Sequence, residues 1–425
     1  MKLLVVGGGG REHTIIKKLK ENPSVDTIYA LPGNGGIATD AICVPEIGAK
    51  DIAAIVEFAK EKAVDFAVVA PDDPLALGCV DRLHEVGIPC FGPDAKAARI
   101  EASKVFSKNL MKKYGIPTAG YEVFNDPAKA MEYLKGASFP IVIKADGLAL
   151  GKGVLIPQNY DEACNAVKSI MEDKAFGDSG NEIVIEEFLT GPEVSVLAFT
   201  DGTAIRPMVS SMDHKRAGDG DTGLNTGGMG TVAPNPYYTA DVAQECMDTI
   251  FLPTLAAMRT EGCPFKGCLY FGLMITPNGP KVIEYNCRFG DPETQVVLPL
   301  LKTDLLTVMQ AVENETLADL EVEWSEGAAA CVILASGGYP GTYEKGKVMT
   351  LPEITPDNVT IYHAGDKISD GTLVTSGGRV LGVTATAPTL AQALNDAYAA
   401  TETIEFDGKY MRHDIGQRAL AAMEV

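Results

Sequence analysis

Residues 141–154 read IVIKADGLALGKGV, an apolar strand followed by a glycine-rich turn and a second short strand. Lys144 lies on the first strand and Lys152 at the tip of the turn. The stretch does not satisfy a Walker A pattern, because its glycine spacing is one residue short and Gly153 replaces the Ser or Thr that would hold Mg²⁺. What remains is a glycine hairpin whose main-chain donors and two ammonium groups suit the phosphates of a nucleotide.

The chain around this hairpin predicts a small α+β lobe, with a helix near 161–171 and a further strand at 183–188. Upstream, a helical pattern begins after Asp94, a favourable N-cap residue, and runs to Tyr114. The sequence Gly115-Ile116-Pro117 then ends that helix.

The first hundred residues alternate β-branched runs with helical patterns, as in a parallel sheet with crossover helices. We expect strands at 2–6, 27–31, 66–70 and 90–91, and helices at 52–62 and 75–85. Ligands of open α/β sheets lie at the carboxyl ends of the strands, so the loops there are candidate binding elements.

The whole chain is predicted to be a multidomain α/β and α+β protein. About 150 residues per domain would give three units in 425 residues. We divide the chain into an N-terminal parallel-sheet domain (1–103), a part with a small flap lobe (104–192, the lobe from about 119), a second lobe (193–325) and a C-terminal α/β cap domain (326–425). In the last, strands are expected at 329–335 and 379–386 and a helix at 389–401.

The strand at 282–288, VIEYNCR, carries the most specific side-chain pattern. Alternation places Glu284, Asn286 and Arg288 on one face of the strand. Carboxylate and amide oxygens are ligands that suit Mg²⁺, and a guanidinium can hold a phosphate or a carboxylate. The strand therefore predicts a metal site beside an anion site.

The segment GGGGREH, residues 7–13, follows a strand and opens a helix, a geometry that directs backbone N–H groups at an anion. The dinucleotide pattern GxGxxG fails here, because its third glycine falls on Glu12 or His13. The second strand also lacks an acidic residue at its end, where Ala30-Leu31-Pro32 stands. A nicotinamide-dependent oxidoreductase is therefore disfavoured.

The net charge and the cysteine content of the chain limit the binding partners and the kinds of site that we expect. The chain carries a formal net charge of −21 without a basic block, so neither nucleic acid nor an anionic membrane is an expected partner. Bound phosphate would need a local positive pocket. Nine cysteines without a CxxC pair indicate neither a disulfide framework nor a zinc site. With no signal-peptide core and no apolar membrane span, we expect a cytoplasmic protein, and we expect a monomer.

A lysine-bearing glycine hairpin, an EEFL strand end and a Glu-x-Asn strand, in this order, resemble the ATP-grasp ligases. The strings GGGGREH, LPGNGG, IEEFLTGPEVS, DHKRAGDGDTGLNTGGMG, VIEYNCRFGDPETQ and ASGGYPG resemble those of the phosphoribosylamine–glycine ligase family of purine biosynthesis. The resemblance runs from Met1 to Arg412-His413-Asp414-Ile415-Gly416. It implies the substrates ATP, glycine and 5-phosphoribosylamine, with Mg²⁺ or Mn²⁺ as the metal.

The same resemblance implies roles for individual residues. ATP phosphates would be bound by Lys104, Lys144 and the flap residues Gly151, Lys152 and Gly153, the adenine by the hinge with Glu186, Glu187 and Leu189, and the ribose by Glu193. The metal would be held by Glu284 and Asn286, and catalysis would involve Arg288, Asp213 and Asn225. Phosphoribosylamine and glycine would be bound by Gly8, Gly9, Gly10, Asn34, Gly35, Asp213 and Arg288.

The implied chemistry is the activation of glycine as glycyl phosphate, followed by attack of the ribosylamine nitrogen. Two anions must be held in line, so positioning and electrostatics dominate and no Ser/His/Asp set is needed. The flap with Lys152 should close over the reactive acyl phosphate. An ATP-grasp enzyme with another acid or amine, and a regulatory nucleotide-binding module without turnover, are the alternatives.

The sequence departs from the family pattern at three places. The run Ala70-Pro71-Asp72-Asp73-Pro74 stands where Gly-Pro-Glu-x-Pro is usual, and Leu224 stands where a proline is common. The strand over 269–275 contains no acidic residue that could act as a further metal ligand. The first two departures could alter the substrate edge but remove no predicted phosphate or metal ligand, and the third leaves a second metal site without a predicted carboxylate.

Overall fold

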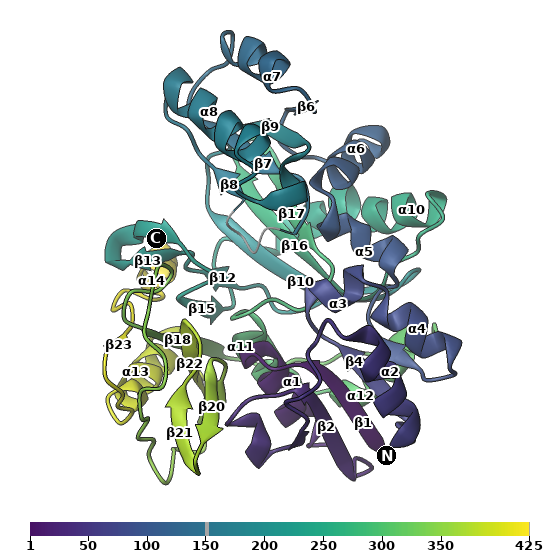
Figure 1. Ribbon diagram of the computed structural model, residues 1–425, viewed down its shortest axis with the longest axis vertical. Coiled ribbons are helices and arrows are strands. Elements are labelled where there is room, and N and C mark those ends of the chain that lie inside the picture. The colour runs from purple at the N-terminus through teal and green to yellow at the C-terminus, as the bar shows by residue number, and fades with distance from the viewer. Residues whose placement is uncertain (149–152, 425) are drawn as a thin grey trace.

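The computed structural model describes residues 1–148 and 153–424 and confirms the predicted multidomain α/β architecture. Its N-terminal unit is a five-stranded parallel sheet in the order β3-β2-β1-β4-β5, with helices on its faces (Figure 1). The strands are β1 (Lys2–Gly7), β2 (Thr27–Pro32), β3 (Ile42–Cys43), β4 (Phe66–Val69) and β5 (Cys90–Phe91). The helices are α1 (Gly10–Leu19), α2 (Ile52–Glu61), α3 (Asp72–Ala76) and α4 (Cys79–Glu85).

Two helices that the sequence predicts as continuous are broken. The helix expected at 75–85 is split into α3 and α4, because Gly78 takes a left-handed conformation between them. The helix expected from Asp94 to Tyr114 is two helices, α5 (Ala95–Ala102) and α6 (Lys104–Tyr114), which meet at Ser103. The predicted ends are confirmed, since Asp94 accepts a hydrogen bond from the amide of Ala97 and Gly115 caps α6 in a left-handed conformation.

The flap lobe is a four-stranded antiparallel sheet in the order β6-β9-β7-β8 with two helices. Its strands are β6 (Tyr121–Phe124), β7 (Ile141–Ala145), β8 (Val154–Leu155) and β9 (Ile183–Glu187), and its helices are α7 (Pro127–Leu134) and α8 (Tyr160–Val167), the latter extended to Glu172 by a π turn. Buried apolar side chains of this lobe form a cluster of their own. In Figure 1 the lobe stands apart at the top of the molecule.

The second lobe is built on the antiparallel sheet β11-β10-β16-β17. Its strands are β10 (Glu193–Asp201), β11 (Ile205–Pro207), β16 (Lys266–Thr276) and β17 (Gly279–Asn286), and its helices are α9 (Ala240–Cys246), α10 (Leu252–Thr260), α11 (Thr294–Val297) and α12 (Leu305–Glu313). Two apolar clusters join this lobe to the N-terminal sheet, for example through Phe199 and Phe289 packed on Phe91. The N-terminal unit and the second lobe therefore share their core.

The C-terminal unit contains a sheet in the order β12-β15-β18-β22-β19, with β23 beside β18. Its elements are β18 (Ala328–Ser336), β19 (Val359–His363), β22 (Arg379–Ala387), β23 (Lys409–Tyr410), α13 (Leu390–Thr401), α14 (Gln417–Met423) and the hairpin of β20 (Asp366–Ser369) and β21 (Thr372–Thr375). The strands β12 (Met212–Asp213) and β15 (Gly230–Ala233) belong to this sheet although they precede residue 326. A division at 326 therefore cuts through one sheet. It would also separate Val232 from the apolar core of the C-terminal unit, to which this side chain belongs.

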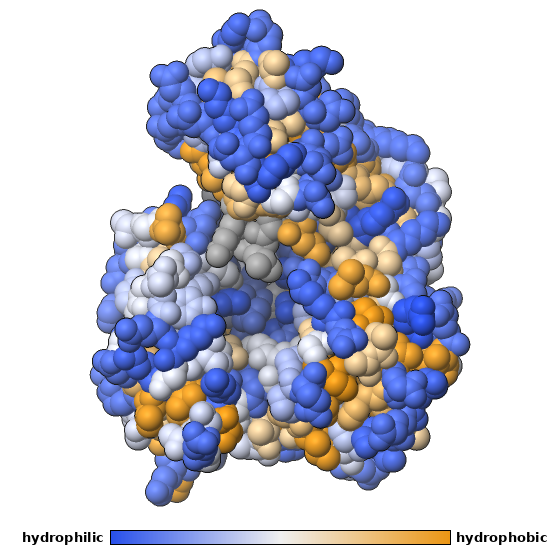
Figure 2. All heavy atoms as spheres, viewed as in Figure 1, coloured by the Kyte–Doolittle hydropathy of each residue, from blue (hydrophilic) through white to orange (hydrophobic). Residues whose placement is uncertain are grey.

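The units surround a hollow on the face shown in Figure 2, below the flap lobe and between the N-terminal and C-terminal units. The long loop after β12 carries the small hairpin β13 (Arg216–Gly218) and β14 (Thr222–Asn225). Among residues 1–148 and 153–424, no helix is long and apolar enough to cross a membrane.

Candidate active site

Two lysines and one glutamate form a buried charge cluster where the flap lobe meets the second lobe. Lys144 on β7 lies with its Nζ 3.0 Å from Oε1 of Glu186 on β9, and Lys108 on α6 lies 3.0 Å from the other carboxylate oxygen. Lys144 also donates to the carbonyl oxygen of Ile283 on β17 at 3.0 Å. Burial lowers the pKa of Lys108 to about 8, although Glu186 opposes the shift. The predicted phosphate lysine and hinge glutamate are thus direct partners.

Lys104 is brought to the glycine hairpin by a capping interaction from another element. The carboxylate of Asp146 accepts hydrogen bonds from the Val105 amide at 3.0 Å and the Ser103 hydroxyl at 3.2 Å, at the start of α6. Lys104 Nζ then donates to the carbonyl oxygen of Gly147 at 2.7 Å. Burial lowers the pKa of Lys104, and the nearby Glu284 carboxylate partly restores it.

The predicted metal face of β17 meets an additional lysine from the long loop. Nζ of Lys215 lies 3.0 Å from Oε2 of Glu193 and 3.9 Å from Oε1 of Glu284. Burial acts to raise the pKa of Glu284, but Lys215, Lys144 and Lys104 lower it on balance. Three ammonium groups from three elements therefore hold Glu284 as a carboxylate. Glu193 holds the pKa of Lys215 well above its usual range.

The donor chemistry of β17 fits a divalent cation. Glu284 and Asn286 occupy the same face of the strand, as alternation predicts, and both present oxygen ligands. Within the described part of the chain, no group of three or more His, Cys, Asp or Glu side chains could hold a metal ion. A cation here would need further oxygen ligands from a bound phosphate or water, as is usual for Mg²⁺.

The other hinge residues lie at the exposed end of β9. Glu187 Oε1 accepts hydrogen bonds from the Gly120 amide and from Lys281 Nζ, each at 3.0 Å. These contacts lower the pKa of Glu187. Leu189 follows the strand and is partly exposed, and Gly153 accepts a hydrogen bond from the Ala145 amide at 2.9 Å. The predicted flap residues Gly151 and Lys152 lie outside the described residues.

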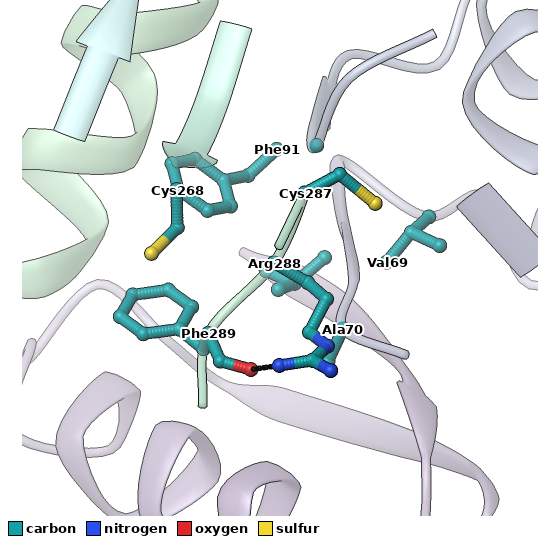
Figure 3. A pocket seen from close by; sticks show the side chains of 9 residues that line it. Val69, Ala70, Phe91, Cys268, Cys287, Arg288 and Phe289 are labelled. Atoms are coloured by element: carbon teal, nitrogen blue, oxygen red, sulfur yellow. Dashed lines mark hydrogen bonds between the residues drawn. The ribbon is translucent and has the colours of Figure 1, made fainter. Parts of the chain in front are cut away.

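Arg288 lies at the seam between the second lobe and the N-terminal unit. Its Nη2 is 2.9 Å from Oε1 of Glu101 on α5, and the other oxygen of Glu101 accepts the amide of Cys287 at 2.7 Å. Although burial opposes the charge, Glu101 raises the pKa of Arg288. Nε of Arg288 is buried and has no hydrogen-bond partner among residues 1–148 and 153–424. Figure 3 shows the guanidinium beside a small cavity bordered by Ala70 and Phe289.

A second guanidinium reaches the same point from the N-terminal unit. Arg11 Nη1 donates to the carbonyl oxygen of Phe289 at 3.0 Å, and Arg288 Nη1 lies 3.5 Å from that oxygen. Nε of Arg11 is 2.6 Å from Oε1 of Glu12. The guanidinium groups of Arg11 and Arg288 therefore meet at one carbonyl group. Each carries further N–H donors, which favours an anionic ligand there.

The glycine loop of the N-terminal unit already contacts carboxylates of the protein itself. The Gly9 amide donates to Oε2 of Glu12 at 2.6 Å, so the Glu12 carboxylate caps the start of α1. The amide of Arg11 donates to Oδ2 of Asp291 at 3.4 Å. A substrate anion at Gly8, Gly9 or Gly10 would therefore compete with, or lie beside, these internal acceptors.

Asp213 and Asn225 lie on different strands, β12 and β14. Asp213 on β12 accepts hydrogen bonds from the His214 amide at 2.7 Å and the Thr231 hydroxyl at 3.3 Å. Burial and the nearby carboxylate of Glu293 raise the pKa of Asp213 well above its usual range. Asn225 instead ends the exposed strand β14.

Several charged residues at the site were not assigned a role from the sequence, among them Lys108, Lys215 and Glu293. Lys215 stands in the DHKR motif, so the basic cluster in a long loop was an available signal. Glu293 accepts the Tyr270 hydroxyl at 3.0 Å and is buried. Lys108 gave no local signal, because its partner Glu186 is 78 positions away in the sequence.

Comparison with known proteins finds relatives along nearly the whole chain. Models of the phosphoribosylglycinamide synthetase N domain, ATP-grasp (A) domain and C domain match residues 1–101, 102–294 and 329–418. The phosphoribosylamine–glycine ligase of Chlorobaculum tepidum is 48% identical over 99% of this chain and 100% of that protein. The trifunctional purine biosynthetic protein adenosine-3 of Gallus gallus is also 48% identical, and the chain spans 42% of its length.

A solved structure extends the agreement to the fold. The crystal structure of phosphoribosylamine–glycine ligase from Thermotoga maritima has a TM-score of 0.85 and 37% identity, covering 98% of this chain and all of that one. Fold and site together define an ATP-grasp enzyme, which uses ATP. The chain belongs to the phosphoribosylglycinamide synthetase family, the phosphoribosylamine–glycine ligases of purine biosynthesis.

Proposed function

We propose that this site joins glycine to 5-phosphoribosylamine, with ATP converted to ADP and phosphate. The observation that carries the proposal is the meeting of Lys104, Lys144 and Lys215 around Glu284, at the junction of the two lobes. In a chain of net charge −21, this gathering of ammonium groups offers the local positive pocket that a triphosphate requires. The predicted ATP residues Glu186, Glu187, Leu189 and Glu193 would hold the nucleoside, with Gly151, Lys152 and Gly153 over the phosphates.

A divalent cation, Mg²⁺ or Mn²⁺, would be held by Glu284 and Asn286. When bound, it would offset the negative charge that builds up on the transferring phosphoryl group. The protein supplies the remaining cations, because Lys104 and Lys144 reach the same region from α6 and β7.

The reaction then proceeds in two balanced steps. A carboxylate oxygen of glycine attacks the γ-phosphorus of ATP, the bond to the β-phosphate oxygen breaks, and ADP leaves. The nitrogen of phosphoribosylamine attacks the carbonyl carbon of glycyl phosphate, phosphate leaves with the electron pair of the broken C–O bond, and the nitrogen loses a proton to water. Catalysis comes from holding the reactants in line in a dry site.

Arginines and carboxylates beside this pocket suit the two small substrates. We assign Arg288, with its unpartnered Nε, and Asp213 to glycine, whose carboxylate and ammonium groups they complement. Asn225 remains a predicted catalytic residue on the adjoining hairpin. The acceptor would bind near Gly8, Gly9, Gly10 and Gly35, where the guanidinium of Arg11 also lies close by.

The test is product identification by mass from ATP, glycine and phosphoribosylamine. We expect glycinamide ribonucleotide and ADP in equal amounts over many turnovers. ADP release with a different acid or amine, but not with this pair, would assign the site to another ATP-grasp reaction. Nucleotide binding without turnover would mean a regulatory module. The predicted monomeric state and cytoplasmic location stay predictions.

A further inference from the structure

The turn between β19 and β20, residues 363–366, crosses from the C-terminal unit to two loops of the N-terminal unit, residues 7–10 and 33–36. These two loops are proposed to bind phosphoribosylamine and are called the acceptor loops. We propose that this turn, here called the acceptor clasp, is a positioning element for phosphoribosylamine, with Asp366 as its central residue. The inference rests on the proposed function of the site. It assigns the C-terminal unit a role in the second chemical step.

Asn34 shows how closely the loops and the clasp are joined. Its side-chain Nδ2 donates to the carbonyl oxygens of Gly8 at 3.0 Å, His363 at 2.8 Å and Ala364 at 3.3 Å. Its Oδ1 accepts the amide of Ile37 at 2.8 Å. Both polar atoms of Asn34 are therefore engaged within the protein, so its role is to hold the glycine loop against the clasp.

Asp366 anchors the second loop from the opposite side. Its carbonyl oxygen accepts the Gly35 amide at 3.4 Å, and its Oδ1 accepts the Gly36 amide at 3.2 Å. Its Oδ2 lies 2.5 Å from Nδ1 of His363, which fixes the side chain. The carboxylate is buried, so these hydrogen bonds are shielded from water.

The fit between the clasp and the second loop depends on the absence of side chains. A Cβ atom on Gly36 would lie 1.9 Å from the His363 ring, and one on Gly35 would lie 2.6 Å from Cδ1 of Leu373. The main chain of the loop thus packs directly on the hairpin. Such close contact transmits small shifts of the clasp to the loop.

A third contact ties the clasp to helix α1, which follows the glycine loop. The amide of His363 donates to Nδ1 of His13 at 2.8 Å, and Nε2 of His13 lies 3.0 Å from Oδ2 of Asp40. Both acceptor loops and the start of α1 are therefore fixed by one turn that is more than 300 residues away in the sequence.

The clasp acts on the acceptor side alone. None of the described hydrogen bonds and ion pairs of Asp366 or His363 involves Lys104, Lys144 or Glu284. Loosening the clasp should leave ATP and glycine in place while the acceptor amine is held less well. Glycyl phosphate would then form but be lost more often to water, and ADP would exceed the amide product.

The test compares Asp366→Asn with Asp396→Asn, a matched change in the same unit. Asp396 on α13 accepts hydrogen bonds from Asn358 and Gln392, and none of its hydrogen bonds among the described residues involves the loops. In Asp366→Asn we expect the KM for phosphoribosylamine to rise roughly 10-fold or more, since a small misplacement of a reactant can cost up to about 10²-fold. The KM values for ATP and glycine should change less than about twofold, and the ratio of ADP to product should rise above that of the wild type.

The results for these variants distinguish a positioning role of the clasp from a merely structural one. A fall in melting temperature without a change in the phosphoribosylamine KM or in the ADP-to-product ratio would make the clasp merely structural. Equal effects in Asp396→Asn would also overturn the proposal. If Asp366→Asn does not fold, Leu373→Ala, which trims the hairpin where it packs on Gly35, decides by the same two readouts. A wild-type enzyme that does not use phosphoribosylamine would refute the proposed function, and the clasp with it.

Discussion

The buried cluster of Lys108, Glu186 and Lys144 offers a sharp test, because one carboxylate serves two ammonium groups. The most exposed of the three side chains, Lys144, is only 5% exposed, and both nitrogen–oxygen distances are 3.0 Å. At an effective dielectric constant of about 20, each contact is worth about 5 kcal/mol before desolvation is subtracted. Removing one partner of a buried pair costs about 3–5 kcal/mol in practice. We therefore expect Glu186→Gln to destabilise the flap lobe by about 3–5 kcal/mol at pH 7.

The pH dependence of this loss follows from Lys108. Its pKa is about 8 in the folded protein and near 10.5 when unfolded, so the folded state disfavours the charged form. The burial of charged Lys108 therefore lowers the free energy of unfolding by its full amount below pH 8, and this effect disappears as the pH rises toward 10.5. Without Glu186 the pKa of Lys108 falls further. The difference in the free energy of unfolding between Glu186→Gln and the wild type should therefore become smaller from pH 7 to pH 9.5.

Urea unfolding followed by circular dichroism at pH 7 and pH 9.5 measures the difference in the free energy of unfolding. Amide hydrogen exchange at pH 7 tests whether the loss of stability lies in β7 and β9. The matched control is Glu132→Gln on α7, whose partner Lys135 and own side chain are more than half exposed. That control should change stability by less than about 1 kcal/mol. A loss below about 1 kcal/mol in Glu186→Gln, or one that does not shrink at pH 9.5, would refute the reasoning.

Three further predictions concern activity, packing and pH. Glu284→Ala should lower turnover by about 10²-fold or more, measured as ADP release with both substrates. The control Glu315→Ala, at an exposed side chain, should keep a turnover near that of the wild type. A near-normal rate for Glu284→Ala would contradict the assignment of Glu284 to the metal. Gly36→Ala should lower the free energy of unfolding by about 2 kcal/mol or more because the new methyl group meets His363, whereas Gly48→Ala, with open space around it, should be nearly neutral. Burial lowers the pKa of His13 to about 4, so the unfolded state takes up a proton first as the pH falls below 6.5, and up to about 3 kcal/mol of stability is lost by pH 4. In His13→Asn this part of the acid loss should vanish from urea titrations, and an unchanged slope would show that other groups cause it.

The sequence predicts those parts of the fold whose cause is local. The strands of the N-terminal sheet are apolar runs such as Leu3 to Val6, which are fully buried in the structure. The alternation at β17 places Glu284 and Asn286 on one face, because strand period alone sets that geometry. Caps at Asp94 and Gly115 are likewise short-range effects.

Features that depend on distant partners were not predicted. The break at Ser103 combines a local cap, since the Ser103 hydroxyl accepts the Phe106 amide, with a distant one from Asp146, 43 residues away, which accepts the Val105 amide. Strand β15 joins the C-terminal sheet by pairing Gly230 with Val332, a choice that a four-residue apolar segment cannot reveal by itself. Lys108 looks like a surface residue of a helix until β9 supplies its counter-charge.

The charged residues of the site also explain how a strongly acidic chain can receive a triphosphate. Four lysines, at positions 104, 108, 144 and 215, face three carboxylates, at 186, 193 and 284, so these side chains together carry a formal charge of only +1. A triphosphate that entered alone would bring its charge next to Glu193 and Glu284, and these two carboxylates would oppose its attraction to the lysines. A triphosphate that enters with a divalent cation can instead place the cation on Glu284 and free Lys215 for phosphate. On the proposed assignment of Glu284 and Asn286 to the metal, charge balance therefore favours binding of metal and nucleotide together.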